Sequence, residues 1–98
     1  LMTEKGTKIL AVLAQTLKND NHRIAVEGHT DARVFASSNY SNWELSTARA
    51  SAARLELERA GLPSIRLIRV SGFASTDPLI SENPLDPRNR RISILVFK

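Results

Sequence analysis

A helical repeat of apolar residues occupies positions 4–19 near the start of the chain. Apolar side chains recur there every four positions, so they share one face of a helix. These residues are Ile9, Leu13 and Leu17, with Leu10 and Val12 beside them. Thr3 precedes the repeat and is a suitable N-cap residue. The pattern therefore predicts an amphipathic helix over residues 4–19.

A second helix is predicted between Ser41 and Gly61, because its start and its end both carry clear signals. Ser41 followed by Glu44 forms a capping box, in which each residue satisfies a backbone N–H of the other. Gly61 is suited to the C′ position, and Pro63 prevents the helix from continuing. Apolar residues follow the cap at helical spacing; they are Leu45, Ala48, Ala52 and Leu55.

Three segments alternate at a period of two and are predicted to be strands: residues 23–27, 67–71 and 92–97. One parity of these strands is apolar, and it comprises Ile24, Val26, Ile68, Val70, Ile92, Ile94 and Val96. The other parity carries Arg23, Glu27, Arg69, Ser71 and Ser93. Helices are therefore expected on one face of the sheet only. The predicted fold class is an α/β (α+β) two-layer sandwich rather than a doubly wound sheet, whose strands would be apolar throughout.

Two long connections separate these elements. Residues 29–40 lack any periodicity and form a loop of a length that is more often functional than merely connective. Gly28 is expected to end the strand before this loop. Residues 73–90 contain Pro78, Pro84 and Pro87 and are predicted to form an ordered loop with one short turn around residues 78–80.

The composition fits a single domain over residues 1–98, with 42% hydrophobic and 24% charged residues. A formal net charge of +4 favours anionic partners. Nucleic acid is not expected among them, because the basic residues are scattered and aromatic residues are few. The longest apolar run, residues 9–13, is far too short to span a bilayer. Any membrane anchor of the native protein is expected outside this chain.

Four short motifs occur in a fixed order along the chain. They are Gly28-His29-Thr30-Asp31, Asn42-Trp43-Glu44-Leu45-Ser46 with Arg49-Ala50, Gly72 with Pro78, and Asn89-Arg90-Arg91-Ile92. Together they resemble the OmpA-like peptidoglycan-binding family. The string Ser41-Asn42-Trp43-Glu44-Leu45-Ser46 and the long loop before it are similar to the flagellar stator branch of that family, which MotB typifies. The resemblance covers about residues 9–97.

This resemblance implies a non-catalytic, C-terminal wall-anchoring domain that ties a flagellar motor stator to peptidoglycan. It implies a periplasmic location in an inner-membrane protein, a homodimer, and a MotA-type stator subunit as a partner of the missing transmembrane part. The wall-anchoring domain of an OmpA porin or of a Pal-type lipoprotein is the alternative, and a purely structural dimerisation module is a third. Family domains begin with a strand before the first helix, which this chain lacks. An N-terminal truncation is expected, and loss of that strand in this lineage is the alternative.

The resemblance also implies a ligand, the meso-diaminopimelate residue of the peptidoglycan stem peptide, whose free end carries an ammonium and a carboxylate. On the matching positions Asp31 would bind the ammonium and Arg49 the carboxylate, for which its planar fork of donors is suited. Asn42 and Thr30 would add neutral hydrogen bonds. Helical spacing independently places Asn42, Leu45 and Arg49 on one face. These five residues form the predicted ligand site.

Each charged residue of this site also has a structural interpretation. Asp31 would cap a turn after its strand, a common role of Asp. Arg49 would be a solvated or salt-bridging helix residue, with Asp31 as its structural partner. The four ordered motifs favour ligand binding over both interpretations.

Catalysis, metals and cofactors are not expected. The chain contains no cysteine, and its serines near His29 have no matching base and orienting group. His22 and His29 are the only histidines and lack clustered carboxylates or thiolates that would complete a metal site. A wall hydrolase is therefore the weaker hypothesis, and both histidines are predicted to be structural or exposed.

Overall fold

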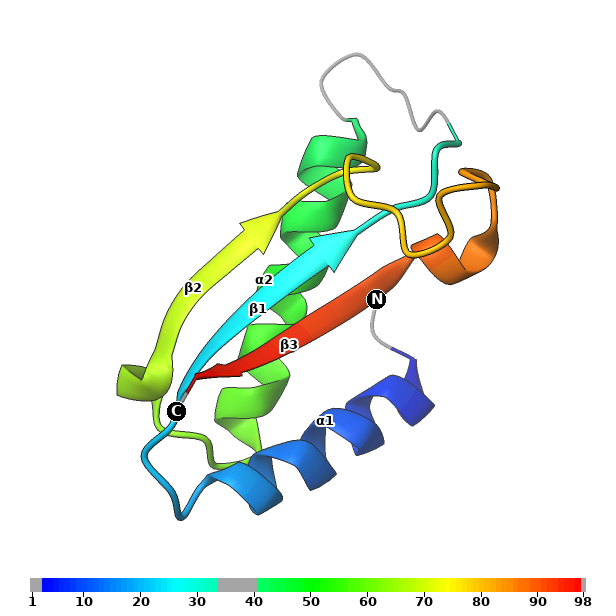
Figure 1. Ribbon diagram of the computed structural model, residues 1–98. Helices are drawn as coiled ribbons and strands as arrows, with labels where there is room; N and C mark the ends of the chain where they lie inside the picture. Colours follow the sequence, from blue (N-terminus) through cyan, green and yellow to red (C-terminus); the bar gives the residue numbers. More distant parts are fainter. Residues whose placement is uncertain (1–2, 34–40, 98) are drawn as a thin grey trace.

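The computed structural model describes residues 3–33 and 41–97, which form a mixed sheet of three strands with two helices. The elements are α1 (Glu4–Leu17), β1 (Arg23–His29), α2 (Asn42–Arg59), β2 (Leu67–Gly72) and β3 (Arg91–Phe97), with 3₁₀ turns at Ser64–Arg66 and Pro87–Asn89. The sheet has the order β2-β1-β3, in which β1 pairs parallel with β2 and antiparallel with β3. The predicted α+β sandwich is confirmed (Figure 1).

The hydrophobic core lies between the helices and one face of the sheet. α2 runs along β1 and β2, and α1 packs against α2 (Figure 1). Ile24 and Val26 of β1 are fully buried in this core, as are Ala53 and Leu57 of α2. The opposite face of the sheet carries polar residues, as predicted, but also the apolar Ala25 and Leu95, which pair with each other. It carries Glu27 and Arg69, whose side chains lie 3.5 Å apart.

The helices bury slightly different faces from those that the apolar repeats predict. α1 buries Leu10, Ala14 and Leu17, whereas Ile9 and Val12 are 58% and 66% exposed. α2 buries Ser46, Ala50, Ala53 and Leu57, whereas Leu55 is 48% exposed. The small residues Ala14, Ser46, Ala50 and Ala53 define the contact faces, because they let the helices approach their neighbours closely.

Two strand residues expected on the core face are exposed, and one of them is Val96 near the end of β3, at 42%. Ile68, expected on the core face, is 45% exposed, and Leu67 packs against the core instead. The cause is an irregularity in the pairing of β1 with β2, where Ile24 pairs with Leu67 but Ala25 pairs with Arg69. The extra residue shifts the alternation by one, so Leu67 faces inwards before it, while Val70 after it keeps the predicted inward position.

Gly28 does not end β1, which continues to His29. Its role is to allow α2 to approach, since a Cβ at Gly28 would lie 2.0 Å from the carbonyl oxygen of Ser46. Gly72 at the end of β2 meets the same helix, and a Cβ there would lie 2.3 Å from Oγ1 of Thr47. These two glycines hold the first turns of α2 against the ends of β1 and β2.

Candidate functional site

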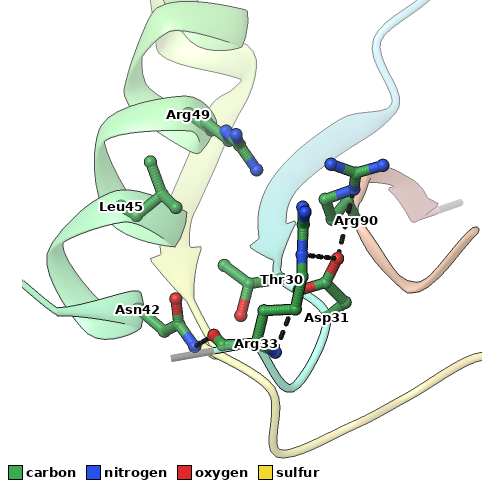
Figure 2. A pocket seen from close by; sticks show the side chains of 7 residues that line it. All are labelled: Thr30, Asp31, Arg33, Asn42, Leu45, Arg49 and Arg90. Atoms are coloured by element: carbon green, nitrogen blue, oxygen red, sulfur yellow. Dashed lines mark hydrogen bonds and ion pairs between the residues drawn. The ribbon is translucent and has the colours of Figure 1, made fainter. Parts of the chain in front are cut away.

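A pocket of about 290 Å³ lies between the end of β1, the start of α2 and the residue that precedes β3. Its lining residues are Thr30, Asp31, Arg33, Asn42, Leu45, Arg49 and Arg90. Figure 2 shows the helix residues on one wall and the strand and loop residues on the other. The structure therefore brings all five predicted site residues to one pocket. It adds Arg33, and Arg90 from the motif at the start of the last strand, neither of which was among the predicted ligand-binding residues.

The helix wall is formed by Asn42, Leu45 and Arg49, which share one face of α2 as their spacing predicts. The predicted capping box fixes the start of this wall: the Ser41 hydroxyl accepts a hydrogen bond from the backbone N–H of Trp43 at 3.2 Å, and Glu44 Oε1 accepts one from the backbone N–H of Ser41 at 2.7 Å. Glu44 Oε1 also accepts a hydrogen bond from the Ser41 hydroxyl at 2.6 Å. This bond and the one from the Ser41 N–H lower the pKa of Glu44 below its usual value of 4.5.

The strand wall is formed by Thr30 and Asp31, which follow β1 directly. Backbone hydrogen bonds tie this segment to the loop between β2 and β3. The N–H of Thr30 donates to the carbonyl of Ala74 at 2.8 Å, and the N–H of Ala32 donates to the carbonyl of Pro84 at 2.9 Å. Both Thr30 and Asp31 are only 3% exposed. The wall is thus held on both sides of the Asp31 carboxylate.

The Asp31 carboxylate contacts two guanidinium groups. Arg33 Nε lies 3.2 Å from Oδ1 and 3.0 Å from Oδ2, and Arg90 Nε lies 3.3 Å from Oδ2. Burial by itself raises the pKa of Asp31, but the hydrogen bonds and charge of Arg33 and the charge of Arg90 outweigh it. The pKa therefore lies below its usual value of 3.8, and the carboxylate is ionised at neutral pH.

Arg90 is placed by its neighbour Asn89, whose side chain is fully buried. The Asn89 side-chain oxygen accepts a hydrogen bond from the N–H of Ile80 at 2.7 Å. Its amide nitrogen donates to the carbonyls of Ile80, Asn83 and Pro84 at 3.3, 3.1 and 3.3 Å. The carbonyl of Pro84 also accepts a hydrogen bond from the N–H of Ala32. The buried side-chain amide of Asn89 therefore links the Arg90 side of the pocket to the Asp31 side.

Arg49 differs from the other two arginines of the pocket. All three side chains are exposed, but Arg33 and Arg90 pair with Asp31. The side chain of Arg49 forms no ion pair or hydrogen bond within residues 3–33 and 41–97. The interpretation of Asp31 as the structural partner of Arg49 is therefore wrong, since Asp31 is paired with Arg33 and Arg90. The turn-capping interpretation of Asp31 is confirmed, because Oδ1 accepts a hydrogen bond from the backbone N–H of Arg33 at 3.1 Å.

Other polar groups near the pocket are buried. The Thr30 hydroxyl has no hydrogen-bond partner among the described residues. His29 is 1% exposed and stacks on Phe73 with ring centroids 5.2 Å apart, which confirms the structural role predicted for it. In the described part of the chain no three His, Asp or Glu side chains are placed to hold a metal ion. Among the same residues no helix is long and apolar enough to cross a membrane.

The pocket is built from the motifs that carry the sequence resemblance, and a sequence model of the OmpA family matches residues 1–91. The chain belongs to the OmpA family. Motility protein B of Escherichia coli K12 is 48% identical over 91 residues. That match covers 91% of the chain and 30% of the relative, so the chain corresponds to less than a third of the length of the relative.

Several solved structures share this fold. The cell wall anchor of the T6SS from Pseudomonas aeruginosa is 30% identical, with a TM-score of 0.77 over 97% of the chain and 68% of that structure. The C-terminal domain of Helicobacter pylori MotB has a TM-score of 0.83 over 100% of the chain and 77% of that structure, at 22% identity. The second likeness extends the agreement in fold to a MotB domain.

Proposed function

We propose that this domain binds peptidoglycan without catalysis, and that it recognises the meso-diaminopimelate residue of the stem peptide. The supporting observation is a pocket with an ionised carboxylate on one wall and an exposed guanidinium on the other. A ligand end that carries both an ammonium and a carboxylate complements this pair. Asp31 would accept the ammonium and Arg49 would hold the carboxylate through paired N–H donors.

The remaining lining residues fit the same role. Asn42 and the buried hydroxyl of Thr30 offer neutral hydrogen bonds, and Leu45 offers an apolar surface for the methylene chain of diaminopimelate. The first turn of α2 also presents the positive end of the helix dipole, which favours a carboxylate beside Arg49. None of these groups forms a nucleophile with a base, which supports binding rather than hydrolysis.

In the whole protein this binding would anchor a flagellar stator to the cell wall, as the 48% identity to motility protein B supports. On this proposal residues 1–98 are the C-terminal, periplasmic domain of an inner-membrane protein. That protein would act as a homodimer and would associate with a MotA-type subunit through a transmembrane part outside this chain.

A sedimentation assay with purified peptidoglycan sacculi tests the proposal. We expect the wild-type domain to sediment with sacculi, and Asp31→Asn and Arg49→Ala to remain in solution. Matched controls are Asp86→Asn and Arg54→Ala, because these residues form ion pairs outside the pocket, with Arg88 and Glu58. Undiminished sedimentation of both pocket variants would contradict the site, and equal loss in the controls would reveal non-specific charge binding.

A further inference from the structure

The carboxylate proposed to receive the ligand ammonium is already occupied by a cation of the same chain. Arg33 places Nε within 3.2 Å of both oxygens of Asp31, as Figure 2 shows. The two side chains differ in exposure, since Arg33 is 60% exposed and Asp31 only 4%. The carboxylate is therefore fixed in the wall of the pocket, while the guanidinium covers it from the solvent side.

The main chain of Arg33 is held independently of its side chain. Its N–H donates to Asp31 Oδ1 at 3.1 Å, and its carbonyl accepts a hydrogen bond from the Asn42 amide at 2.9 Å. The guanidinium can therefore leave Asp31 by side-chain rotation while the backbone stays in place. Because Arg33 is the exposed member of the pair, water can solvate the guanidinium once it has rotated away, and Arg90 still contacts the buried carboxylate.

The second guanidinium on Asp31 is more constrained. Arg90 is 38% exposed, and it follows the buried Asn89, which fixes its backbone. Its single contact, with Oδ2 at 3.3 Å, leaves Oδ1 open to a ligand once the Arg33 side chain has moved away. Arg33 is thus the cation that an incoming ammonium would replace, and Arg90 the one that would stay.

We propose that Arg33 is a specificity-determining residue, an internal competitor that a ligand ammonium must displace from Asp31. The proposal rests on the proposed function, because it concerns the same carboxylate and the same ammonium. The pocket holds three arginines and one carboxylate among the described residues, so a cation alone is repelled by the other charges. A ligand that also brings a carboxylate to Arg49 gains enough to displace Arg33. The competitor therefore rejects simple amines.

Calorimetric titration with the soluble tripeptide L-Ala–D-Glu–meso-diaminopimelate tests this competition. We expect Arg33→Gln to bind the tripeptide about two- to fivefold more tightly than the wild type, the range that corresponds to an ion pair whose cation is exposed to solvent. Cadaverine, a diamine without a carboxylate, should gain at least the same factor. The matched control is Arg88→Gln, because Arg88 contacts Asp86 in the same spacing and with the same kind of hydrogen bonds, outside the pocket.

The outcomes separate the two proposals. Tripeptide binding by the wild type with equal or weaker binding by Arg33→Gln overturns the competition and leaves the proposed function intact. Binding by Arg33→Gln alone supports strong competition. No binding by any of the proteins overturns both proposals. The Arg33 Nε–H resonance gives a second readout in the wild type: it should move on addition of tripeptide, and an unchanged resonance in the bound state counts against displacement.

Discussion

Gly28 of β1 lies so close to α2 that a Cβ on it would stand 2.0 Å from the carbonyl oxygen of Ser46. The clash would be with the backbone, which a side-chain rotation cannot relieve. We expect Gly28→Ala to lower the free energy of unfolding by about 2–3 kcal/mol, because α2 must move away from the sheet. Urea unfolding checks this value.

The matched control for that variant is Gly6→Ala in the first turn of α1, where alanine is the better helix former. It should leave the stability unchanged or raise it. Since α2 carries Asn42, Leu45 and Arg49, Gly28→Ala should also weaken sacculus binding although Gly28 does not line the pocket. Full stability in Gly28→Ala would show that the helix can shift freely.

Arg49→Lys tests whether the pocket needs a planar fork or only a positive charge. Lysine keeps the charge but cannot donate two parallel hydrogen bonds to one carboxylate. We expect about a tenfold loss of affinity for the diaminopimelate tripeptide, in line with hydrogen bonds to charged groups. Arg54→Lys is the control, because Arg54 pairs with Glu58 further along the same helix. Unchanged affinity in Arg49→Lys would mean that the fork geometry is not used.

The parts of this site that the sequence predicts are those that depend on neighbours in the chain. The Ser41–Glu44 capping box spans three residues, and helical spacing fixes the common face of Asn42 and Arg49. Such relationships require no knowledge of the tertiary fold. They therefore appear in the structure as predicted.

The partners of Asp31 could not be predicted in this way. Arg33 is near in sequence, but a loop of unknown shape gives no direction for its side chain. Arg90 comes from the other end of the chain and reaches Asp31 only through the loop that Asn89 organises. The role of Gly28 could not be predicted for a different reason. In the sequence, a glycine that ends a strand looks the same as one that lets a helix pack closely against the strand. Only the packing of α2 distinguishes them.

Asn89 should be critical for the loop that carries Arg90. Asn89→Ala removes four hydrogen bonds and leaves backbone groups of residues 80–84 without their partner. We expect the free energy of unfolding to fall by about 2–3 kcal/mol, the cost of leaving buried polar groups unpaired. Asn83→Ala in the same loop is the control, because the side chain of Asn83 is exposed and only its backbone is bonded. Equal stability of the two variants would contradict this role.

The lowered pKa of Asp86 predicts that the stability of the fold depends on pH in the acid range. Hydrogen bonds from Arg88, to both carboxylate oxygens, lower the pKa of Asp86 from 3.8 to about 2. Because the folded state binds this proton less tightly than the unfolded state, the carboxylate stabilises the fold fully above about pH 3.8. This contribution is lost as the pH falls towards about 2.

The measurement is the difference in urea midpoint between the wild type and Asp86→Asn. We expect this difference to be constant at neutral pH, to shrink between about pH 3.8 and pH 2, and to vanish below that range. Asp77→Asn controls for the loss of one negative charge, because Asp77 is exposed and forms no ion pair within the described residues. A difference that persists below pH 2 would assign the effect of Asp86 to something other than its charge.

Arg66 joins the end of α1 to the start of β1 and should be the most sensitive arginine for stability. It is 7% exposed, and its guanidinium donates to the carbonyl of Leu17, to the carbonyl of His22 at 2.8 Å and to Asp20 at 2.5 Å. Lysine has one nitrogen and cannot reach three acceptors that lie in different directions. We expect Arg66→Lys to lower the free energy of unfolding by about 2 kcal/mol, because two of the three acceptors, which are buried or part-buried, lose their donor. Arg59→Lys is the control, because the Arg59 side chain is 71% exposed in its ion pair with Glu56, and it should change the free energy of unfolding little. An equal loss in both variants would contradict a specific role for Arg66.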